Sequence, residues 1–502
     1  MYTKVILLIA GLTCFCSSIY SQKTHKLSFK INITDSLKKD FDNEGRLFLC
    51  LSTDHPLPVS AFHPGGSNVI AKNIRGFPIE EGLVIKKSNG WTSVFDWSFE
   101  NIPEGTYYVQ AVWKPDPYFG FRQDGVIYST VQKVIIDKKS AVVLNLDWWP
   151  RRKLIEHPLV REIDIQSDTL SSWWDKPMHI KASVLLPSGY DENSSVKYPI
   201  RYNVAGYGGR YFRVESLIND EGFMSWWESN ESPQVINVFL DGYGPYGDCY
   251  QLDSENSGPY GYSLIHEQIP FIESKYRGTS FNETRFVDGC STGGWVSLAL
   301  QLIYPDVFNG CFSYSPDGVD FENFQLINIY EDQNAFVNEH GYEQPMRRSI
   351  IGEPMWSMRE YIAYENIQSS TNSYTQSGGQ FSAFNALYGT KAENGFPSAM
   401  FDPLTGTINT EIARQWGKYD LLKYVKENWT TLGPKIAGKI YVSIGDMDDF
   451  YLNIAMRSFD AFLLTTENPK SNAKIEFLPT VGHCRQYSHR TVLEQIAIKL
   501  NE

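Results

Sequence analysis

The stretch RFVDGCSTGGW, residues 285–295, decides how the rest of this chain is interpreted. Residues 289–293 fit the pattern G-x-S-x-G, in which a serine sits on a tight turn between a strand and a helix. A strand-like run leads into the turn, and the helical pattern TGGWVSLALQLIY follows it directly. Such a turn accepts only small residues beside the serine, and Gly289, Gly293 and Gly294 supply them. The stretch therefore predicts that Ser291 is a nucleophile; the alternative is an ordinary serine in a glycine-rich turn.

Strand and helix patterns alternate on both sides of this stretch. The strand-like runs from about residue 160 onward are HIKASVLLP, YPIRYNVAG, QVINVFLDG, TRFVDGC, GCFSYS, KIYVSIG and AKIEFLPT. The helical runs between them include SLIHEQIPFIESKYR, YLNIAMRSFDAFLLTT and HRTVLEQIAIKL. This alternation predicts an α/β fold with a doubly wound, mostly parallel sheet.

A serine nucleophile needs a base, and the base needs an acid that orients it. In this type of site the acid and the histidine follow the serine in chain order. The run KIYVSIGDMDDFYLN is a strand that ends in a loop with three aspartates, of which we expect Asp448 to be the acid. Asp449 is the nearest alternative and Asp317 a more distant one. The loop could instead be merely solvated or hold a cation.

The expected base is His483, at the end of the strand-like run IEFLPTVGHC. Both loops follow the carboxyl ends of strands, where ligands gather on an open α/β sheet. Among the nine histidines of the chain, His489 is the nearest alternative, but it begins the last helical pattern. A structural histidine in a loop is the other interpretation of His483.

The oxyanion formed by serine attack needs two N–H groups aimed at it. We expect one from the amide of Thr292, directly after the nucleophile. The second is expected from the loop after the strand in YPIRYNVAGYGGRY, with the amide of Tyr207 as first choice and Gly206 as the alternative. A plain turn is also compatible with this loop.

Residues 22–150 are expected to form a small β-sandwich domain. The runs KLSFKINI, GRLFLCLS, GTYYVQAVW, VQKVIID and AVVLNLD are rich in β-branched and aromatic residues and are separated by turn signals. Period-two alternation places Tyr107, Val109, Ala111 and Trp113 on one face of a strand.

The catalytic domain is expected over residues 151–502. One long segment, about residues 319–438, interrupts its alternation of strand and helix and is rich in aromatic residues. A structureless loop of that length is uncommon in a compact domain. We therefore expect a cap inserted over the sheet.

Residues 1–21 read as a signal peptide: Lys4 precedes a short apolar stretch, and small residues lead to Ser21. A membrane anchor is the alternative. The net charge of −13 and the lack of a basic run make nucleic acid and anionic membranes poor partners. The mature protein is therefore expected to be secreted or periplasmic, with no membrane association after cleavage.

Residues from about 160 to the end resemble a family of α/β-hydrolase esterases that includes esterase D-like, enterochelin esterase-like and bacterial feruloyl esterase-like enzymes. The stretches that carry the resemblance are VLLPSGYD, KYPIRYNVAGYGG, FLDGYGPYG, HEQIPFIESKYR and FVDGCSTGGW. The resemblance implies an α/β-hydrolase fold and a triad of Ser291, Asp448 and His483. The family's usual oxyanion-loop histidine is Ala205 here, which matters little because the donor is a backbone amide.

GCSTGG and GHC together are similar to the paired-cysteine pattern of tannases and fungal-type feruloyl esterases. That resemblance implies a disulfide between Cys290 and Cys484, holding the serine and histidine loops together; two buried thiols are the alternative. Seven cysteines are present, and five follow the leader, so at least one thiol stays free or pairs with another molecule.

The resemblance implies a carboxylic-ester hydrolase that needs no cofactor or metal, and the expected signal peptide implies that it is exported. Its substrate would be a small-molecule or saccharide ester, such as a hydroxycinnamoyl ester of a polysaccharide. A serine peptidase and a catalytically inactive binding protein are the alternatives. The N-terminal domain could also bind carbohydrate through Trp91, Trp97 or Trp113, although such residues more often belong to a core. The sequence leaves the oligomeric state open.

Overall fold

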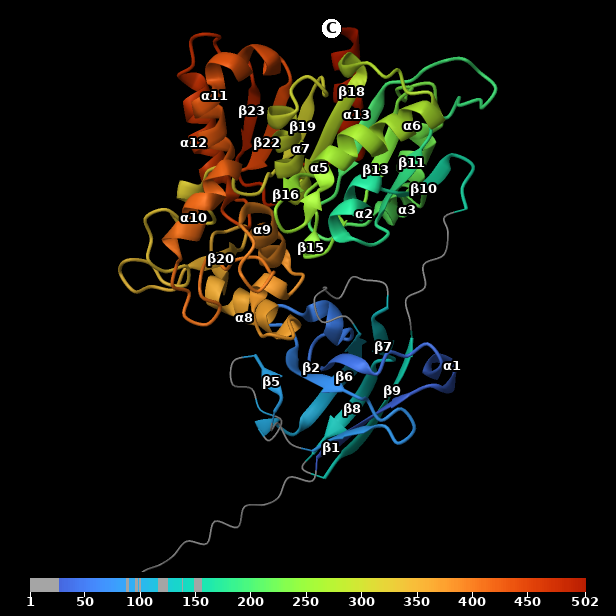
Figure 1. The fold of residues 1–502 in the computed structure, drawn as a ribbon, viewed down its shortest axis with the longest axis vertical. Helices are drawn as coiled ribbons and strands as arrows, with labels where there is room; N and C mark the ends of the chain where they lie inside the picture. Colours follow the sequence, from blue (N-terminus) through green and yellow to red (C-terminus); the bar gives the residue numbers. More distant parts are fainter. Residues whose placement is uncertain are drawn as a thin grey trace, which may run out of the picture.

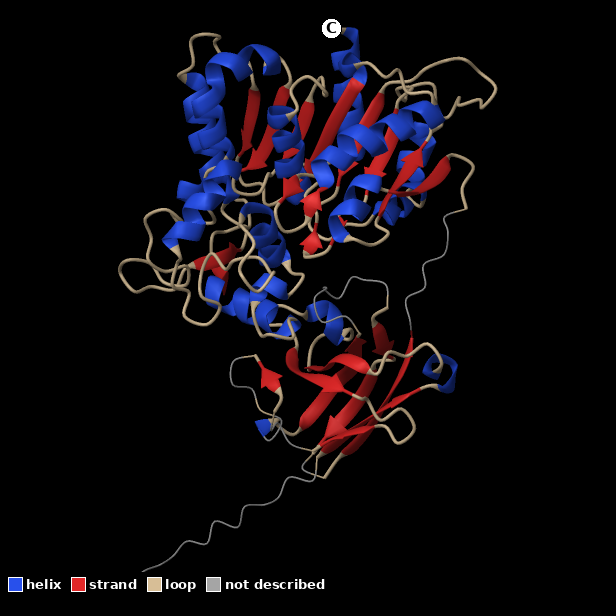
Figure 2. Ribbon diagram, viewed as in Figure 1, coloured by secondary structure: helices blue, strands red, loops and turns tan. Residues whose placement is uncertain are grey.

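A computed structural model describes residues 27–86, 90–94, 98, 101–115, 125–137, 139–148 and 156–502. The expected signal peptide and Trp97 lie outside the described residues. Figure 1 shows a β-rich unit at the amino-terminal end of the chain and a larger unit of strands and helices beyond it. Figure 2 shows that helices flank the strands of the larger unit on both sides.

The described N-terminal strands form one nine-stranded sheet in the order β4-β1-β9-β7-β6-β2-β3-β5, with β8 paired to β6. Its strands are β1 (Ser28–Ile33), β2 (Glu44–Ser52), β3 (Asn68–Arg75), β4 (Leu83–Ile85), β5 (Thr92–Ser93), β6 (Gly105–Lys114), β7 (Ile127–Ser129), β8 (Gln132–Ile136) and β9 (Ala141–Trp148). Helix α1 (Asp35–Lys38) and the single turn η1 (Pro58–Ala61) interrupt them. The β-rich N-terminal unit agrees with the sequence pattern.

One face of this sheet encloses an apolar core. Tyr107, Val109, Ala111 and Trp113 of β6 all belong to it, as their alternation along the strand predicts. Trp113 is fully buried and donates its indole N–H to the carbonyl of Asp42, 3.0 Å away. The idea that Trp113 binds carbohydrate is therefore wrong, because its ring has no surface to offer.

The α/β unit, described without gaps over residues 156–502, is built on an eight-stranded sheet in the order β10-β11-β13-β12-β18-β19-β22-β23. Its strands are β10 (Val160–Gln166), β11 (His179–Leu185), β12 (Ile200–Val204), β13 (Ile236–Leu240), β18 (Arg285–Cys290), β19 (Cys311–Tyr314), β22 (Ile440–Gly445) and β23 (Lys474–Leu478). The pairs from β13 to β23 are parallel, while β11 is antiparallel to both neighbours. This is the α/β-hydrolase fold that the sequence predicts.

Apolar helices cover both faces of the sheet. On one face pack α6 (Ile269–Tyr276), α7 (Thr292–Ile303), α11 (Leu421–Ile436) and α12 (Leu452–Leu464). On the other face pack α3 (Val214–Ile218), α4 (Glu221–Trp227) and α13 (His489–Asn501). Shorter elements complete this part of the chain. The helical ones are α2 (Asp168–Trp174), α5 (Tyr260–Ser263) and the π-helical turn η4 (Leu264–Gln268). Two short hairpins pair β14 (Tyr243–Gly244) with β15 (Gly247–Asp248) and β16 (Asp253–Ser254) with β17 (Gly258–Pro259).

The long segment between β19 and β22 contains its own elements. They are the hairpin β20 (Pro345–Arg348) with β21 (Pro354–Ser357), and the helices α8 (Met358–Gln368), α9 (Gln380–Tyr388) and α10 (Thr410–Trp416), before α11 returns to the sheet beside α7. Most of its aromatic side chains are buried against one another, among them Phe381, Phe384, Tyr388, Phe401 and Trp416. The aromatic composition of this segment therefore reflects packing.

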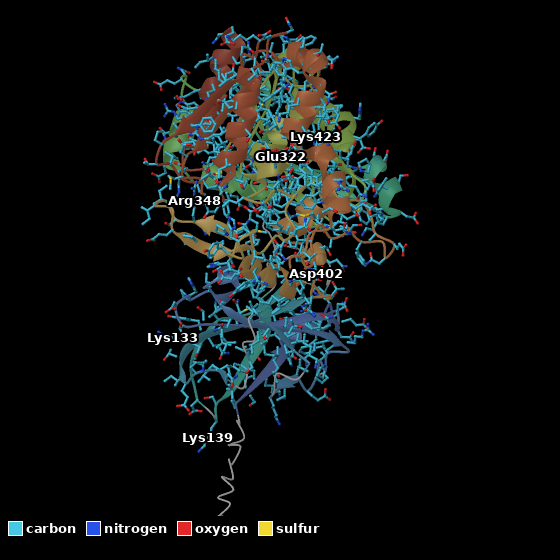
Figure 3. All side chains as sticks on the ribbon, turned by 90° about the vertical axis from the view of Figure 1, so that its left-hand side faces the viewer. Lys133, Lys139, Glu322, Arg348, Asp402 and Lys423 are labelled. Carbon is cyan, nitrogen blue, oxygen red and sulfur yellow. A yellow bond between two sulfur atoms is a disulfide. The ribbon has the colours of Figure 1, made fainter. Side chains whose placement is uncertain are left out.

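Helix α8 joins this segment to the N-terminal sheet. The buried guanidinium of Arg46 donates to the carbonyl of Ile367 at 2.9 Å, and the hydroxyl of Tyr364 donates to the carbonyl of Ser67 at 3.1 Å. Apolar residues of β2, β3 and β6 pack against Tyr364 and Ile367. In Figure 3 the segment that carries Asp402 accordingly lies between the N-terminal sheet and helix α11. None of the helices in the described part of the chain has the length and apolar character that crossing a membrane requires.

Candidate active site

Ser291 lies on the turn between β18 and α7, as the sequence pattern predicts. Its backbone has φ 61° and ψ −126°, a conformation that a non-glycine residue adopts only at a cost of about 1–3 kcal/mol. Strained backbone of this kind gathers at functional sites. The turn leaves the serine half-buried at the edge of a pocket, while its neighbours Cys290 and Thr292 are buried.

The glycines around the serine are required by close packing. A Cβ atom on Gly293 would lie 2.2 Å from the carbonyl oxygen of Val204, and one on Gly289 would lie 2.5 Å from the same oxygen. A Cβ on Gly294 would lie 2.3 Å from the carbonyl oxygen of Tyr314. The turn is thus pressed against the ends of β12 and β19, and it has no room for a side chain at these positions.

Asp448 and His483 are in contact. The Oδ2 atom of Asp448 lies 2.7 Å from Nδ1 of His483, and the Asp448 side chain is fully buried. Its other oxygen, Oδ1, accepts the backbone N–H groups of Phe450 at 2.9 Å and Leu452 at 3.4 Å. The rings of Phe450 and His483 are nearly perpendicular, at 88°, with centroids 5.0 Å apart. The carboxylate and the ring are therefore both held in fixed orientations.

The other candidate aspartates make different contacts. Asp449 accepts the backbone N–H of His483 at 3.0 Å and pairs with Arg347 at 3.2 Å. Asp446 pairs with Arg457 on α12. Asp317 accepts the hydroxyls of Thr292 and Tyr250 at 2.9 and 3.0 Å, and burial raises its pKa. Among the described residues, no three His, Cys, Asp or Glu side chains are arranged to hold a metal ion.

Two arginines of strand β20 hold the aspartate loop in place. Arg348 donates to the backbone carbonyl of Asp448 at 2.9 Å and to that of Asp446 at 3.1 Å. Arg347 pairs with Asp449 and lies over the ring of Trp356 at 4.6 Å. Sequence reasoning missed both residues, because nothing in their spacing links residues 347 and 348 to a loop one hundred positions later.

Burial and charge act in opposite directions on His483. Burial disfavours the imidazolium and lowers the pKa, but the negative charge and hydrogen bond of Asp448 outweigh burial. The pKa of His483 therefore stands above its ordinary value of 6.5. The aspartate thus favours the imidazolium that forms when the histidine accepts a proton.

The loop after β12 lies against Ser291. A Cβ on Gly206 would lie 3.8 Å from Cβ of Ser291, so the backbone at this point is close to the serine. Tyr207 follows, lines the same pocket as Ser291 and donates its phenol to the carbonyl of Gly378, between α8 and α9. Thr292 opens helix α7, where the first N–H groups have no partner within the helix and the dipole favours negative charge.

A disulfide joins Cys290 to Cys484, with Cα atoms 6.0 Å apart and a sequence separation of 194. It connects the residue before Ser291 to the residue after His483. Cys50, Cys249 and Cys311 carry free thiols, all of them buried.

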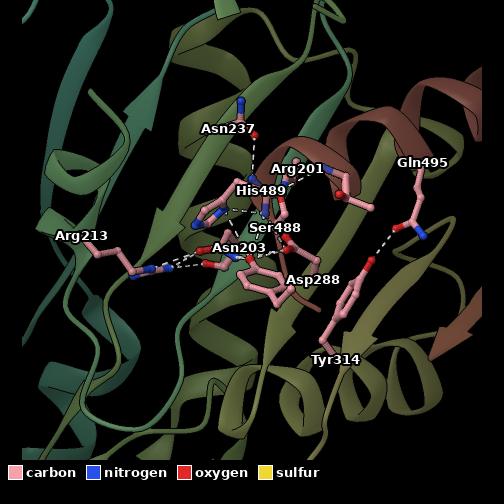
Figure 4. Close-up of polar contacts among 11 residues, drawn as sticks. Arg201, Asn203, Arg213, Asn237, Asp288, Tyr314, Ser488, His489 and Gln495 are labelled. Carbon is pink, nitrogen blue, oxygen red and sulfur yellow. Dashed lines mark hydrogen bonds and ion pairs between the residues drawn. The ribbon is translucent and has the colours of Figure 1, made fainter. Parts of the chain in front are cut away.

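A buried polar network connects β12 and β18 to the residues that lead into α13 (Figure 4). Arg201 on β12 and Asp288 on β18 form a fully buried ion pair, with atoms 2.6 Å apart. The hydroxyl of Tyr487 donates to Asp288 at 2.9 Å and accepts from the amide of Asn203 at 2.8 Å. His489 Nδ1 accepts from Arg201 at 2.9 Å, and burial, assisted by Arg201, holds the pKa of His489 well below 6.5. His489 is therefore neutral and bonded within the network.

Ser291, His483 and the loop of Tyr207 line one pocket of about 470 Å³. Its other lining residues include Phe450, Gln380, Tyr487 and Arg213. Burial lowers the pKa of Arg213 to about 10, which still leaves it charged at neutral pH. The pocket thus brings together a serine, a histidine paired with a carboxylate, and a helix start. Gln380 and Arg213 were not anticipated from the sequence.

Comparison with known proteins gives one family match over most of the α/β unit. The family model described as "Putative esterase" matches residues 176–491. Among curated proteins, the "Uncharacterized protein YjcH" of Bacillus subtilis (strain 168) is 28% identical over 134 residues, which is 26% of this chain. The chain spans about half the length of that relative, 54%.

Several solved structures are similar to the chain. A ferulic acid esterase is 16% identical with a TM-score of 0.42, covering 68% of this chain and 97% of that one. An S-formylglutathione hydrolase from Agrobacterium tumefaciens is 12% identical with a TM-score of 0.37, covering 68% and 94%. A CE1 ferulic acid esterase from Anaeromyces mucronatus, in complex with ferulic acid, is 14% identical with a TM-score of 0.33, covering 68% and 89%.

Proposed function

Because the chain belongs to this esterase family and so to the carboxylic-ester hydrolases, we propose that it hydrolyses its ester through Ser291, His483 and Asp448. The observation that carries the proposal is the 2.7 Å contact between His483 and the buried Asp448. A histidine oriented in this way, in one pocket with a serine on a strained turn, is the arrangement that nucleophilic acyl transfer needs.

In the first half of the reaction, Ser291 Oγ attacks the ester carbonyl while His483 accepts the hydroxyl proton. Asp448 remains ionised and stabilises the imidazolium. The amides of Thr292 and Tyr207 donate to the oxyanion, which forms where the helix start and the β12 loop meet. The bond to the alcohol then breaks, His483 returns the proton to the leaving oxygen, and Ser291 holds the acyl group.

In the second half, His483 takes a proton from water and the resulting nucleophile attacks the acyl-enzyme. The bond to Ser291 Oγ breaks, the proton returns to the serine, and the carboxylic acid leaves. In these reaction steps every proton moves between the substrate, water, Ser291 and His483, so the proposed mechanism needs no cofactor.

The proposal extends to the substrate and to export. We infer that the substrate is an acyl ester of a polysaccharide, with a hydroxycinnamoyl ester as the first candidate, because the sequence motifs around Ser291 and His483 resemble those of feruloyl esterase-like enzymes.

We further propose a signal peptide over residues 1–21, an N-terminal domain over 22–150 and a catalytic domain over 151–502 with a cap at about 319–438. Mass spectrometry of the exported protein should find Gln22 as its first residue.

The decisive test compares the wild type with Ser291→Ala on 4-nitrophenyl esters, methyl ferulate and a methyl glucuronate. We expect hydrolysis to fall by about 10⁴-fold or more, with an unchanged circular dichroism spectrum. Ser297→Ala is the matched control, because that hydroxyl donates to a carbonyl within α7 and lies outside the pocket lining. Equal turnover by Ser291→Ala would refute the nucleophile. If no ester is hydrolysed, peptide 4-nitroanilides are assayed next, and their hydrolysis would indicate a peptidase.

A further inference from the structure

We propose that the substrate lies in an extended cleft, one wall of which the N-terminal sheet supplies, and that this cleft takes a neutral oligosaccharide attached to the ester. This inference rests on the proposed function. It starts from three hollows that follow one another away from Ser291 and share lining residues at each junction.

The first hollow is the catalytic pocket. The second, the middle hollow, has a volume of about 480 Å³ and shares Tyr207 and Gln380 with the first. Gln380 contacts the residue that follows the nucleophile, because its side-chain amide lies 3.5 Å from the hydroxyl of Thr292. The middle hollow therefore begins beside the position where the ester is cleaved.

The third, the distal hollow, has a volume of about 540 Å³ and shares Arg210 and Tyr243 with the middle one. It ends among residues of α2 and β11, including Trp174 and His179. The three hollows together exceed the roughly 300–1,000 Å³ of an ordinary small-ligand pocket. A single acyl group and a small alcohol would leave most of this space unused, so three hollows that share lining residues favour a long substrate.

Two units of the chain build the middle hollow. The N-terminal unit supplies Val59, Ser60, Phe62 and Tyr128, and the cap supplies residues of α8 such as Tyr361 and Gln368. The two walls are fixed relative to each other because Arg46 and Tyr364 bond across the same junction. The N-terminal sheet is therefore a built-in part of the cleft.

The chemistry of the middle and distal hollows matches a neutral sugar chain. Aromatic rings are interspersed with amide and hydroxyl groups, which suits the apolar faces and the hydroxyls of pyranose rings. The charges are largely compensated: Arg210 pairs with Asp241 at 2.8 Å, and Asp164 pairs with His179 at 2.6 Å and Lys181 at 3.2 Å. Burial raises the pKa of Glu365 to about 7, which reduces its charge. A strongly anionic chain would find no uncompensated cluster of cations among the described residues that line these hollows.

The test narrows the middle hollow from its N-terminal wall. Ser60 is exposed on the turn η1, so Ser60→Trp adds a large side chain without disturbing the core. Ser36→Trp is the matched control, since Ser36 is exposed on α1 and lies outside the lining. Each protein is assayed on methyl ferulate and on a ferulate ester of a xylo-oligosaccharide. Binding of xylohexaose to Ser291→Ala, with and without Ser60→Trp, is measured by calorimetry.

We expect Ser60→Trp to raise KM for the oligosaccharide ester about tenfold or more, to leave kcat/KM on methyl ferulate within about twofold, and to weaken xylohexaose binding. The control should resemble the wild type on both esters. Three outcomes would refute the proposed oligosaccharide-binding cleft: equal effects of Ser60→Trp on both esters, no effect on either ester, or no binding of xylohexaose. Failure of the wild type on every small ester would instead overturn the proposed function, so the two failures are distinguishable.

Discussion

Asp448 Oδ2 lies 2.7 Å from the imidazole of His483, whereas the adjacent Asp449 accepts the backbone N–H of the same histidine at 3.0 Å. The two aspartates therefore hold different parts of one residue. Asp448 sets the tautomer and the charge of the ring, and Asp449 positions the loop that carries it.

This difference predicts unequal effects of two equivalent substitutions. Asp448→Asn removes the charge that stabilises the imidazolium and favours the wrong tautomer, so kcat should fall by about 10⁴-fold. Asp449→Asn keeps an oxygen for the backbone N–H of His483 and leaves the ring contact in place, so kcat should fall by less than about tenfold. Steady-state kinetics on one ester separates the two, and a loss with Asp449→Asn as large as with Asp448→Asn would contradict the assignment.

The raised pKa of His483 predicts the pH dependence of the reaction. The base must be neutral to accept the serine proton, so kcat/KM should fall as the pH drops through the pKa of His483 in the free enzyme. Because Asp448 raises that pKa, the midpoint of the acid limb should lie above 6.5. In Asp448→Asn the residual activity should show a lower midpoint, and an acid limb at the same pH in both proteins would show that another group controls it.

The disulfide and Tyr487 hold the histidine loop at two neighbouring points. Cys484 is bonded to Cys290, and three residues later Tyr487 donates to Asp288 on the same strand, β18. Replacing both cysteines by alanine should lower the free energy of unfolding by about 2–5 kcal/mol, because the bond closes a long loop in the unfolded chain. Activity should fall only partly while Tyr487 still anchors the loop. Chemical denaturation and ester kinetics measure the two effects, and unchanged stability would show that the disulfide does not constrain the unfolded chain.

The two attachments are expected to be coupled. Tyr487→Phe alone should have a small effect on kcat, but combined with the loss of the disulfide it should reduce kcat by more than the product of the single effects. Tyr107→Phe is the control, because its hydroxyl donates to the carbonyl of Pro103 at 3.0 Å within the N-terminal unit. Strict additivity in this cycle of variants would show that the disulfide and Tyr487 act independently.

The sequence predicted the parts of the site that depend on local pattern. The turn at Ser291 follows from glycines at fixed offsets, and the sheet follows from the alternation of strand and helix patterns. The contact between Asp448 and His483 was expected because both follow the carboxyl ends of strands, and β22 and β23 are indeed neighbours in the sheet.

Long-range contacts without a local pattern were not predicted. Arg348 binds the aspartate loop from the β20–β21 hairpin, and Arg46 binds α8 from the N-terminal sheet. Each is one arginine among many, and its partner is a backbone carbonyl that any sequence provides. The sequence likewise could not predict whether Trp113 is buried. An aromatic residue on a strand suits both a core and a binding surface, and the choice depends on what packs against that face of the sheet.

The packing around the Ser291 turn predicts that one added methyl group at Gly293 lowers both stability and activity, although it removes no functional group. In Gly293→Ala the added Cβ would lie 2.2 Å from the carbonyl oxygen of Val204 and 2.8 Å from that of Ala205. Both neighbours are backbone atoms that lead into the Tyr207 loop, so the clash has to move α7 or that loop. We expect a loss of about 1–3 kcal/mol in unfolding free energy. The larger effect should be on kcat, because the amides of Thr292 and Tyr207 would separate.

Gly310→Ala is the control for this prediction, as its Cβ would meet the Phe286 ring at an ordinary 3.4 Å. Chemical denaturation and ester kinetics on both variants measure the two effects. The control should keep its kcat, because position 310 lies at the opposite end of the sheet from the turn, directly before β19 begins. A normal kcat in a stable Gly293→Ala protein would refute the proposed role of this packing in aligning the two amides.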